Sequence, residues 1–540
     1  MFFSGKPLWV AASIGYNGDR TMKVIRPSRI NLGVCILAAL AGLGPFNPES
    51  IQATALDDYI AAPDPAYTYS LVRTITQSSY TAYVIDMTSQ SWRRPGEVDR
   101  TLWRHWLTIV VPKTVSHDTA LLYITGGNNG SSAPTSAPSE VVFIATNTQS
   151  VAAQLRMVPN QPLTFPDGGG PRYEDEIIAY TFDKYLTTED ANWPLLLPMA
   201  KSAVRAMDTI QDYLAEPRAG SIEIDHFAVT GASKRGWTTW LTAAVDPRVT
   251  AIIPMVIDVL NIGEQMTHHF AAYGYYSDAI HDYVDLDVIS RMYSPQGRAL
   301  LRIVDPYEYR ERYLLPKYLL NSSGDQFFLP DSAQFYFDDL PADKYLRYIP
   351  NTDHGLYGSY PYSHDALESL TLFYHSVLNN LARPQFTWSV PAENRIEVQT
   401  ITAPKEVRLW QAANPTARNF RLDVIGWAWT VSPLLDQGGG TYIAEVSEPQ
   451  QGWRAFFVEL IFDNETDVDY KFTTEIRVTP DYLPFACDLN RDGALNFLDL
   501  QTFAAEWLAP EPHLADIVPE RGDGAVTLHD FSLCATNLHD

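Results

Sequence analysis

The sequence predicts an α/β fold with a doubly wound, mostly parallel sheet, followed by a small β-sandwich and a short helical module. From about residue 70 to 382, apolar runs typical of buried strands alternate with amphipathic helical patterns, which indicates a sheet covered by helices on both faces. From 385 to 483, shorter alternating segments separated by turn signals favour antiparallel strands. From 484 to 540, two aspartate-rich loops each lead into a helical pattern.

The composition is that of a folded protein with a sizeable core. The chain has 540 residues, of which 46% are hydrophobic and 19% charged. Its 64 acidic and 39 basic residues give a formal net charge of -25. This balance disfavours nucleic acid and anionic membranes as partners, since both attract clustered positive charge. It is compatible with calcium binding and with secretion.

Residues 1–55 are predicted to be an N-terminal extension and a signal peptide. Three basic side chains between positions 23 and 29 precede a 12-residue apolar run, Leu32–Leu43, and a small-x-small site at Ala53–Ala55. The apolar run is shorter than the roughly 20 residues that cross a bilayer, although it could also form a buried helix. We expect cleavage after Ala55 and a secreted, cell-surface or periplasmic protein without a membrane span. Met22 is a better start than Met1 for such a signal.

The first predicted domain, 56–384, contains the alternating pattern. Its predicted strands are Leu102–Val111, Ala120–Thr125, Ile222–Thr230, Thr250–Ile257, Tyr318–Asn321 and Tyr345–Ile349, and its predicted helices include Met199–Leu214, Lys234–Val245 and Ser363–Leu381. Residues 259–316 interrupt the alternation and are rich in Tyr, His and Asp. We interpret this segment as a lid-like insertion at the sheet edge, with a plain structural excursion as the alternative.

The predicted sandwich domain, 385–483, contains short alternating segments such as Glu406–Trp410 and Trp453–Ile461. Turn signals such as Gly438–Gly440 separate them, which is typical of a small antiparallel domain.

The most informative motif follows the strand that ends near Thr230. It reads Gly231-Ala-Ser233-Lys-Arg-Gly236 and leads into a helix that begins at Lys234. In hydrolases, a Gly-x-Ser-x-Gly turn of this kind raises a nucleophilic serine above the sheet edge. Here the second glycine comes one residue late. We predict that Ser233 is a nucleophile and that the backbone N–H of Lys234 is one oxyanion donor, with a plain strand-helix turn as the alternative.

A serine nucleophile needs a base and an acid that orients the base, in the chain order Ser, acid, His. Asp325 follows one predicted strand and His354 follows the next. Both positions lie beyond carboxyl ends of strands, at the sheet edge where Ser233 must also lie. Two other acids remain open: Asp331, which we expect to cap a helix, and Asp258, at the end of an earlier strand.

A second oxyanion donor is expected in a glycine-rich loop after an early strand. Gly127 lies in such a loop, which follows the predicted strand Ala120–Thr125. The alternative is a flexible loop without a role in catalysis.

The segment from about residue 56 to 484 resembles the PhoPQ-activated pathogenicity-related protein family, a branch of α/β-hydrolases. The resemblance is carried by Leu102–Pro112, Thr230–Trp237, Gly324–Asp331 and Asn351–His354. It implies a serine-hydrolase scaffold with Ser233, Asp325 and His354 as the triad, and it implies little about the substrate. The Gly-x-Ser-x-x-Gly spacing is also similar to that of glucuronoyl esterases, which makes a carbohydrate ester conceivable.

The C-terminal segment 484–540 contains an EF-hand-type calcium loop, with a chance polar loop as the alternative. Oxygen ligands recur at positions 1, 3, 5, 7, 9 and 12, and glycine stands at position 6. The predicted ligands are Asp488, Asn490, Asp492, the carbonyl of Ala494, Asn496 and Asp499. A second, degenerate copy offers Asp516, Asp523 and Asp530.

Two such loops, each leading into a helix, resemble a type I dockerin. The resemblance implies calcium-dependent folding and docking to a cohesin-like or cell-surface partner. Cys487 and Cys534 lie 47 residues apart in this segment, and they are interpreted equally well as a disulfide or as two free buried thiols.

The sequence therefore predicts a secreted serine hydrolase, esterase-like, that forms an acyl-enzyme from a small-molecule, sugar or peptide ester or amide. It needs Ca²⁺ for structure and no cofactor for catalysis. Two alternatives stay open: a catalytically inactive binding or surface protein with a hydrolase fold, and a carbohydrate esterase of the glucuronoyl type.

Overall fold

The structure, a computed structural model, describes residues 53–356, 364–464, 468–490, 496–507, 515 and 526–537. Residues 1–52 of the predicted signal peptide lie outside the described residues, as do the predicted calcium ligands Asp492, Ala494, Asp516 and Asp523. The described chain begins just before a short helix, α2 (Ala55–Ala61). Thr54 caps the N-terminus of this helix and forms a capping box with Asp57. Cleavage after Ala55 would remove this cap.

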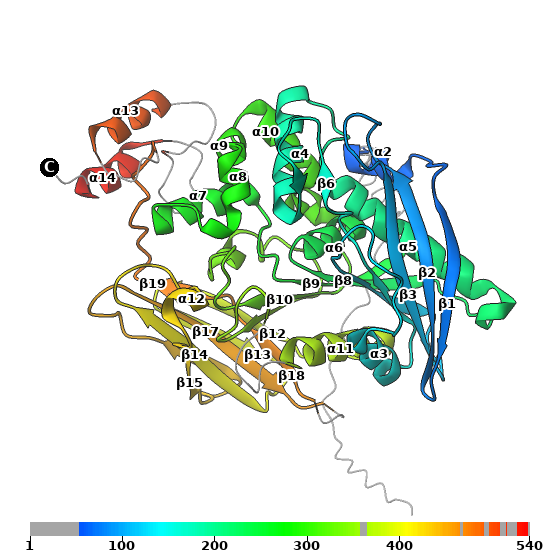
Figure 1. The fold of residues 1–540 in the computed structure, drawn as a ribbon. Helices are drawn as coiled ribbons and strands as arrows, with labels where there is room; N and C mark the ends of the chain where they lie inside the picture. Colours follow the sequence, from blue (N-terminus) through cyan, green and yellow to red (C-terminus); the bar gives the residue numbers. More distant parts are fainter. Residues whose placement is uncertain are drawn as a thin grey trace, which may run out of the picture. The chain divides into compact units, whose positions relative to one another are not determined.

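A large mixed sheet with a parallel core organises the fold (Figure 1). Its strands, in spatial order, are β1 (Thr68–Thr76), β2 (Tyr80–Ser91), β3 (Leu102–Pro112), β5 (Ala152–Leu155), β4 (Thr119–Ile124), β8 (His226–Ala232), β9 (Val249–Met255), β10 (Lys317–Ser322), β11 (Lys344–Ile349), β18 (Tyr470–Thr473), β17 (Trp453–Phe462), β14 (Glu406–Asn414) and β15 (Thr430–Pro433), with β19 (Arg477–Thr479) paired to β17. The strands from β5 to β11 run parallel to one another. The predicted parallel core of an α/β sheet is confirmed.

Both faces of this core are buried, which explains why apolar residues dominate strands such as β4 and β9. In β4, Leu122 packs into the core on one face while its neighbour Leu121 packs on the other, and Val229 and Ala228 of β8 alternate in the same way. Helices cover both sides of the sheet. The first side holds α4 (Glu174–Thr188), α5 (Leu196–Ala215) and α6 (Lys234–Val245), and the second holds α3 (Ser139–Thr148) and α11 (Asp365–Leu378).

The strand β8 begins at His226, four residues later than the apolar pattern predicts. The predicted first residue, Ile222, instead donates its N–H to the carbonyl of Leu214, at the end of α5. The side chain of Gln211 on α5 also donates to the carbonyl of Ile224, so this part of the chain lies against the helix rather than in the sheet.

The antiparallel strands after residue 385 extend the large sheet. The strand β18 pairs with β11 through Leu346 and Thr473. A separate small sheet contains β12 (Phe386–Ala392), β13 (Arg395–Thr400) and β16 (Thr441–Glu445). The antiparallel strands are therefore present, and the boundary of a separate domain at 385 stays a prediction.

A buried ion cluster connects the two parts. Arg347 on β11, with no exposed side-chain area, pairs with Asp365 on α11 at 3.0 Å and with Glu459 on β17 at 2.6 Å. Lys471 on β18 lies 2.7 Å from the same Asp365. Because buried charges are stable only when they are paired, this cluster fixes how the C-terminal strands join the sheet.

The segment 259–316 is mostly helical and follows the carboxyl end of β9. It contains α7 (Ile262–Tyr273), η2 (Asp278–Ile280), α8 (His281–Asp285), α9 (Val288–Arg291), α10 (Pro295–Val304) and η3 (Pro306–Arg312). Figure 1 shows α8, α9 and α10 beside α4.

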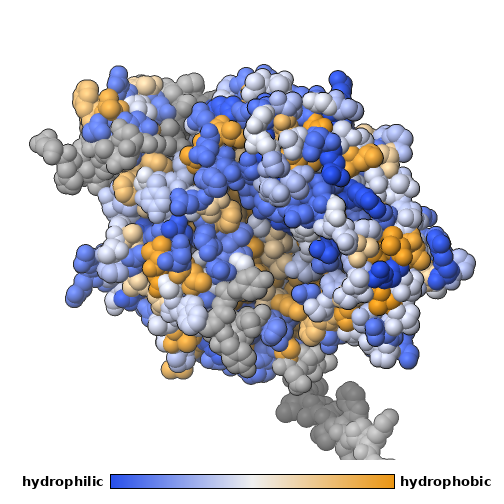
Figure 2. All heavy atoms as spheres, in the orientation of Figure 1, coloured by the Kyte–Doolittle hydropathy of each residue, from blue (hydrophilic) through white to orange (hydrophobic). Residues whose placement is uncertain are grey.

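The remaining described elements are short or belong to the C-terminus. They are β6 (Leu163–Thr164), β7 (Pro171–Arg172), η1 (Pro217–Ala219), η4 (Ser332–Phe335), α12 (Leu422–Ile425), α13 (Phe497–Glu506) and α14 (Leu528–Asn537). None of the helices in the described residues combines the length and apolar character that a membrane span needs. On the face seen in Figure 2, hydrophobic residues are scattered among hydrophilic ones.

Candidate functional site

Ser233 stands at a strained turn between β8 and α6. Its backbone has φ 57° and ψ -129°, a conformation that non-glycine residues rarely adopt. The N–H of Ser233 donates to the carbonyl of Met255 at 2.8 Å, which holds the turn against β9. Lys234 begins α6, so its N–H has no partner inside the helix.

Two glycines allow α6 to approach the sheet this closely. A Cβ at Gly231 would lie 2.6 Å from the carbonyl oxygen of Arg235. A Cβ at Gly236 would lie 2.7 Å from Ile257 and 2.9 Å from the carbonyl oxygen of Gly231. The late second glycine of the motif therefore has a packing role: only a residue without a side chain fits between α6, β8 and β9.

The structure brings Asp325 and His354 together. The ring nitrogen Nδ1 of His354 lies 2.9 Å and 2.8 Å from the two carboxylate oxygens of Asp325. The backbone N–H of His354 also donates to the side-chain oxygen of Gln326 at 2.9 Å. Both residues lie in loops after parallel neighbouring strands, β10 and β11, which puts them at one sheet edge. These contacts fix the orientation of the imidazole.

The other ring nitrogen of His354, Nε2, is buried. Within the part of the chain that the structure describes, no group hydrogen bonds to it. The ring of Phe327 lies 4.2 Å from the imidazole, centroid to centroid. Phe327 also lines the pocket that contains Ser233. The imidazole therefore has one oriented nitrogen and one without a hydrogen-bond partner in the described residues, and its ring contacts Phe327 of the pocket lining.

The two alternative acids have other partners. Asp331 pairs with Arg418 at 2.7 Å and with His268 at 3.0 Å. Burial raises the pKa of Asp331, but Arg418 and His268 outweigh this effect and hold the pKa below its usual range. Asp331 stands at the N-cap position of η4, as expected, but its side chain makes no capping hydrogen bond because these two partners take the carboxylate.

Asp258 is buried and accepts hydrogen bonds from the hydroxyls of Tyr336 and of Tyr348, the latter at 2.5 Å. Burial raises its pKa to about 7, and the nearby Asp325 contributes to this shift.

The glycine-rich loop after β4 lies against the start of α6. Met157 donates its N–H to the carbonyl of Gly126 at 3.0 Å. A Cβ at Gly126 would lie 2.6 Å from the guanidinium of Arg235. The backbone of Gly127 has φ +139°, which favours glycine. The loop is therefore fixed near the Ser233 turn, and the oxyanion role of Gly127 stays a prediction.

Two carboxylates at the start of α4 hold the two cations that follow Ser233. Glu174 lies 3.0 Å from Lys234 and 2.7 Å from Arg235, and Asp175 lies 2.9 Å from Lys234. Burial raises the pKa of Glu174, but Arg235 and Lys234 outweigh it and lower the pKa to about 2. We call these four residues the charge quartet. The sequence pattern does not predict this cluster, because Glu174 and Arg235 are 61 residues apart.

The pocket at the Ser233 turn is mainly apolar. Its lining residues are Asp175, Ser233, Lys234, Trp237, Ile257, Val259, Ile262, Met266, Ile280, Tyr283, Ile289, Met292, Phe327 and Phe328. Half of them, from Val259 to Met292, come from the segment 259–316. This segment therefore shapes the pocket.

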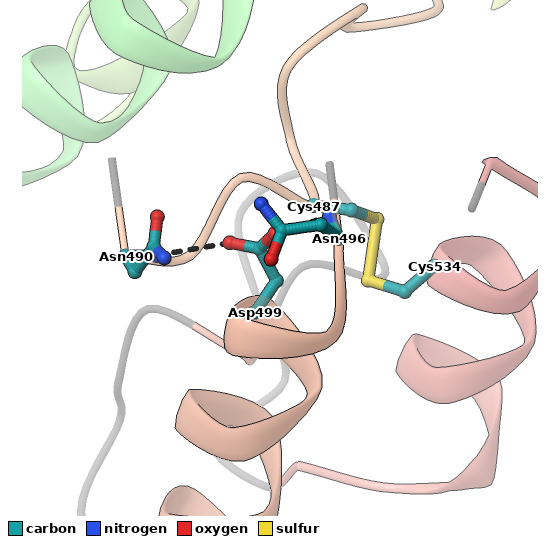
Figure 3. Close-up of a disulfide and its surroundings, with 5 residues drawn as sticks. All are labelled: Cys487, Asn490, Asn496, Asp499 and Cys534. Carbon is teal, nitrogen blue, oxygen red and sulfur yellow. Dashed lines mark hydrogen bonds between the residues drawn. A yellow bond between two sulfur atoms is a disulfide. The ribbon is translucent and has the colours of Figure 1, made fainter. Parts of the chain in front are cut away.

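Figure 3 shows, in the described part of the C-terminal module, a disulfide and three residues of the first predicted calcium loop, Asn490, Asn496 and Asp499. Cys487 and Cys534 are joined, with 5.2 Å between their Cα atoms. In the first loop, Asp499 accepts the backbone N–H of Asn490 at 3.2 Å and that of Asn496 at 2.8 Å. In the second, Asp530 accepts the backbone N–H of Thr527 at 2.8 Å.

Asp488, Asp499 and Asp530 are almost fully buried, as ligands of a bound ion would be. Among the described residues, however, no three acidic, His or Cys side chains gather closely enough to hold a metal.

Comparisons with known proteins place the chain in a family. The model of the PhoPQ-activated pathogenicity-related protein family matches residues 56–421. Autocrine proliferation repressor protein A of Dictyostelium discoideum is 38% identical over 463 residues, which cover 81% of this chain and 92% of that protein.

Similarity to solved structures is low. Acetyl xylan esterase 1 from Thermoanaerobacterium sp. is 16% identical, with a TM-score of 0.41, over 59% of this chain and 91% of that one. A glucuronoyl esterase from Solibacter usitatus is 14% identical, with a TM-score of 0.33, over 59% and 90%. Both are too distant to bear on function. The family match spans most of the chain and includes the Ser233, Asp325 and His354 segments, and the chain therefore belongs to the PhoPQ-activated pathogenicity-related protein family.

Proposed function

We propose that the protein is a secreted serine hydrolase that cleaves esters through an acyl-enzyme. The observation that supports this most is the Asp325–His354 pair: the carboxylate holds one nitrogen of an imidazole whose other nitrogen has no hydrogen-bond partner in the described residues and whose ring contacts Phe327 of the Ser233 pocket. A serine hydroxyl becomes a strong nucleophile only when such a base takes its proton.

In the proposed reaction, Ser233 Oγ attacks the ester carbonyl while His354 Nε2 takes the hydroxyl proton. The backbone N–H groups of Lys234 and Gly127 stabilise the oxyanion. Collapse of the tetrahedral intermediate breaks the bond to the alcohol, which leaves with the proton from His354. Water then attacks the acyl-enzyme by the same proton transfers and releases the acid. Asp325 keeps the imidazole in the tautomer that accepts at Nε2.

A fluorophosphonate probe tests the nucleophile. We expect labelling of the intact protein, because an activated serine forms a stable phosphonyl ester, and loss of labelling in Ser233→Ala. Ser290→Ala is the matched control, since Ser290 is exposed on α9 and should leave labelling unchanged. An intact, folded protein that the probe does not label would contradict the proposal.

The name of the Dictyostelium relative favours a second candidate function. A protein 38% identical to this chain is named as a repressor of proliferation, so a binding role without turnover is consistent with the family. The same experiment separates the two, because a binding protein is not labelled and shows no difference between the wild type and Ser233→Ala.

We further propose that residues 484–540 bind Ca²⁺ and tether the enzyme to a cohesin-like or cell-surface partner. The buried carboxylates of Asp488 and Asp499 support this, since they occupy the first and last positions of the predicted loop. The bound ion would add a structural crosslink between the two ends of that loop.

Calorimetric titration of the full chain with Ca²⁺ tests the calcium proposal. We expect saturable binding, and at least tenfold weaker binding in Asp499→Asn, because the substitution removes a charged ligand. Asp436→Asn is the control: Asp436 also accepts backbone N–H groups in a loop, from Gly438 at 2.8 Å and Gly440 at 3.1 Å. Equal affinity in all three proteins would contradict the assignment.

N-terminal sequencing of the exported protein tests secretion, with Leu56 as the expected first residue.

A further inference from the structure

The pocket beside Ser233 presents mostly hydrocarbon to a ligand. Seven of its lining residues are isoleucine, valine or methionine, and two more are phenylalanine: Ile257, Val259, Ile262, Met266, Ile280, Ile289, Met292, Phe327 and Phe328. Such a lining stabilises an apolar group in proportion to the apolar surface that leaves water.

The polar atoms of its other two aromatic residues are already bonded inside the protein. The indole N–H of Trp237 donates to the carbonyl of Val304 at 2.6 Å. The hydroxyl of Tyr283 donates to Asp175 at 2.9 Å. A ligand rich in hydroxyl groups would lose its hydrogen bonds to water here. These two side chains would not replace those bonds, because they already donate elsewhere.

The charges at the pocket also balance one another. The charge quartet contains two cations, Lys234 and Arg235, and two carboxylates, Glu174 and Asp175, all within ion-pair distance of an opposite charge. The side chain of Lys234 is only 7% exposed. A carboxylate on a ligand would therefore meet no surplus positive charge, and its burial would be costly.

From these three observations we infer that the pocket binds the acyl group of a neutral, apolar ester, such as an ester of a short aliphatic acid. This assignment rests on the proposed function, since the acyl group is the part that stays attached to Ser233. The segment 259–316 supplies most of the aliphatic lining and thereby sets the length of acyl chain that is accepted. Sugar acids and dicarboxylic acids are excluded by the same lining.

A series of p-nitrophenyl esters tests the inference on the full chain. We expect kcat/KM to rise about fourfold for each methylene from acetate to butyrate to hexanoate, because each one leaves water for an apolar wall. A second series, with acetate as the constant acyl group and alcohols of increasing length, should stay within about twofold. A rate that falls with acyl length, or one that rises only with alcohol length, would overturn the inference.

A charge substitution tests the quartet. Asp175→Asn gives the pocket a surplus positive charge, so the rate ratio of p-nitrophenyl hemisuccinate to p-nitrophenyl butyrate should rise at least tenfold. Glu176→Gln is the control, because it removes the same charge from the next position of α4 but lies outside the pocket lining. An equal ratio in the two variants would overturn the role of the quartet.

A binding measurement separates failure of the pocket from failure of the hydrolase. Ser233→Ala is titrated calorimetrically with methyl ketones from 2-butanone to 2-octanone, and we expect affinity to rise with length. Rising affinity without turnover of any ester by the wild type would keep the pocket assignment and overturn the hydrolase. Turnover without a dependence on acyl length would keep the hydrolase and overturn the pocket assignment.

Discussion

Asp325→Asn is expected to lower kcat for ester hydrolysis about 10⁴-fold without unfolding the protein. An amide at this position donates a hydrogen bond to Nδ1 of His354, so the ring proton moves to Nε2. The imidazole then cannot accept the proton of Ser233. Steady-state kinetics on a p-nitrophenyl ester give the rate, and the melting temperature should stay close to that of the wild type.

Asp331→Asn provides the contrast, because the sequence alone left Asp331 open as the acid. Its carboxylate pairs with the buried Arg418, so the substitution removes the nearest negative charge of a buried cation and leaves Asp481 at 3.9 Å. We expect a marked loss of stability and a kcat per folded molecule within about threefold of the wild type. If Asp331→Asn lost kcat and Asp325→Asn kept it, the assignment of the acid would be reversed.

Arg347→Met is expected to destabilise the protein by about 3–5 kcal/mol at neutral pH. The arginine is fully buried and pairs with two buried carboxylates, so its removal leaves, among the described residues, Asp365 with Lys471 alone and Glu459 with Arg408 alone. Urea denaturation of the wild type and the variant measures the difference. Arg218→Met is the control, since the Arg218–Glu216 pair is exposed and should contribute nothing measurable.

This loss should depend on pH. Burial raises the pKa of Asp365, but Arg347 and Lys471 outweigh it and lower the pKa to about 2. A carboxyl whose pKa is lowered on folding contributes stability that is present above about pH 4 and is lost as the pH falls toward 2. The difference between the wild type and Arg347→Met should therefore shrink between pH 4 and 2. A difference that is constant over this range would contradict the role of the ion pair.

The parallel core could be predicted because burial on both faces leaves a local signature. Strands such as β8 and β9 are apolar at nearly every position, and that pattern is legible in a short window of sequence. The same apolar pattern predicts that Ser233, Asp325 and His354 follow strand ends. Because parallel strands end at one sheet edge, the three residues are expected at that edge. The apolar pattern predicts that β8 begins at Ile222, but the strand begins at His226. Ile222 instead bonds to Leu214, and the apolar pattern does not encode this contact.

The sequence by itself determined the α/β class, the turn that carries Ser233 and the order of the acid and the histidine, because each depends on local pattern. Tertiary structure decided which acid meets His354, how the C-terminal strands join the sheet through Arg347, and how the charge quartet neutralises the pocket. These depend on ion pairs between residues far apart in the chain, such as Arg347 and Glu459, 112 residues apart. The strength of an ion pair is set by distance and burial in space, and neither is written in the spacing of residues along the chain.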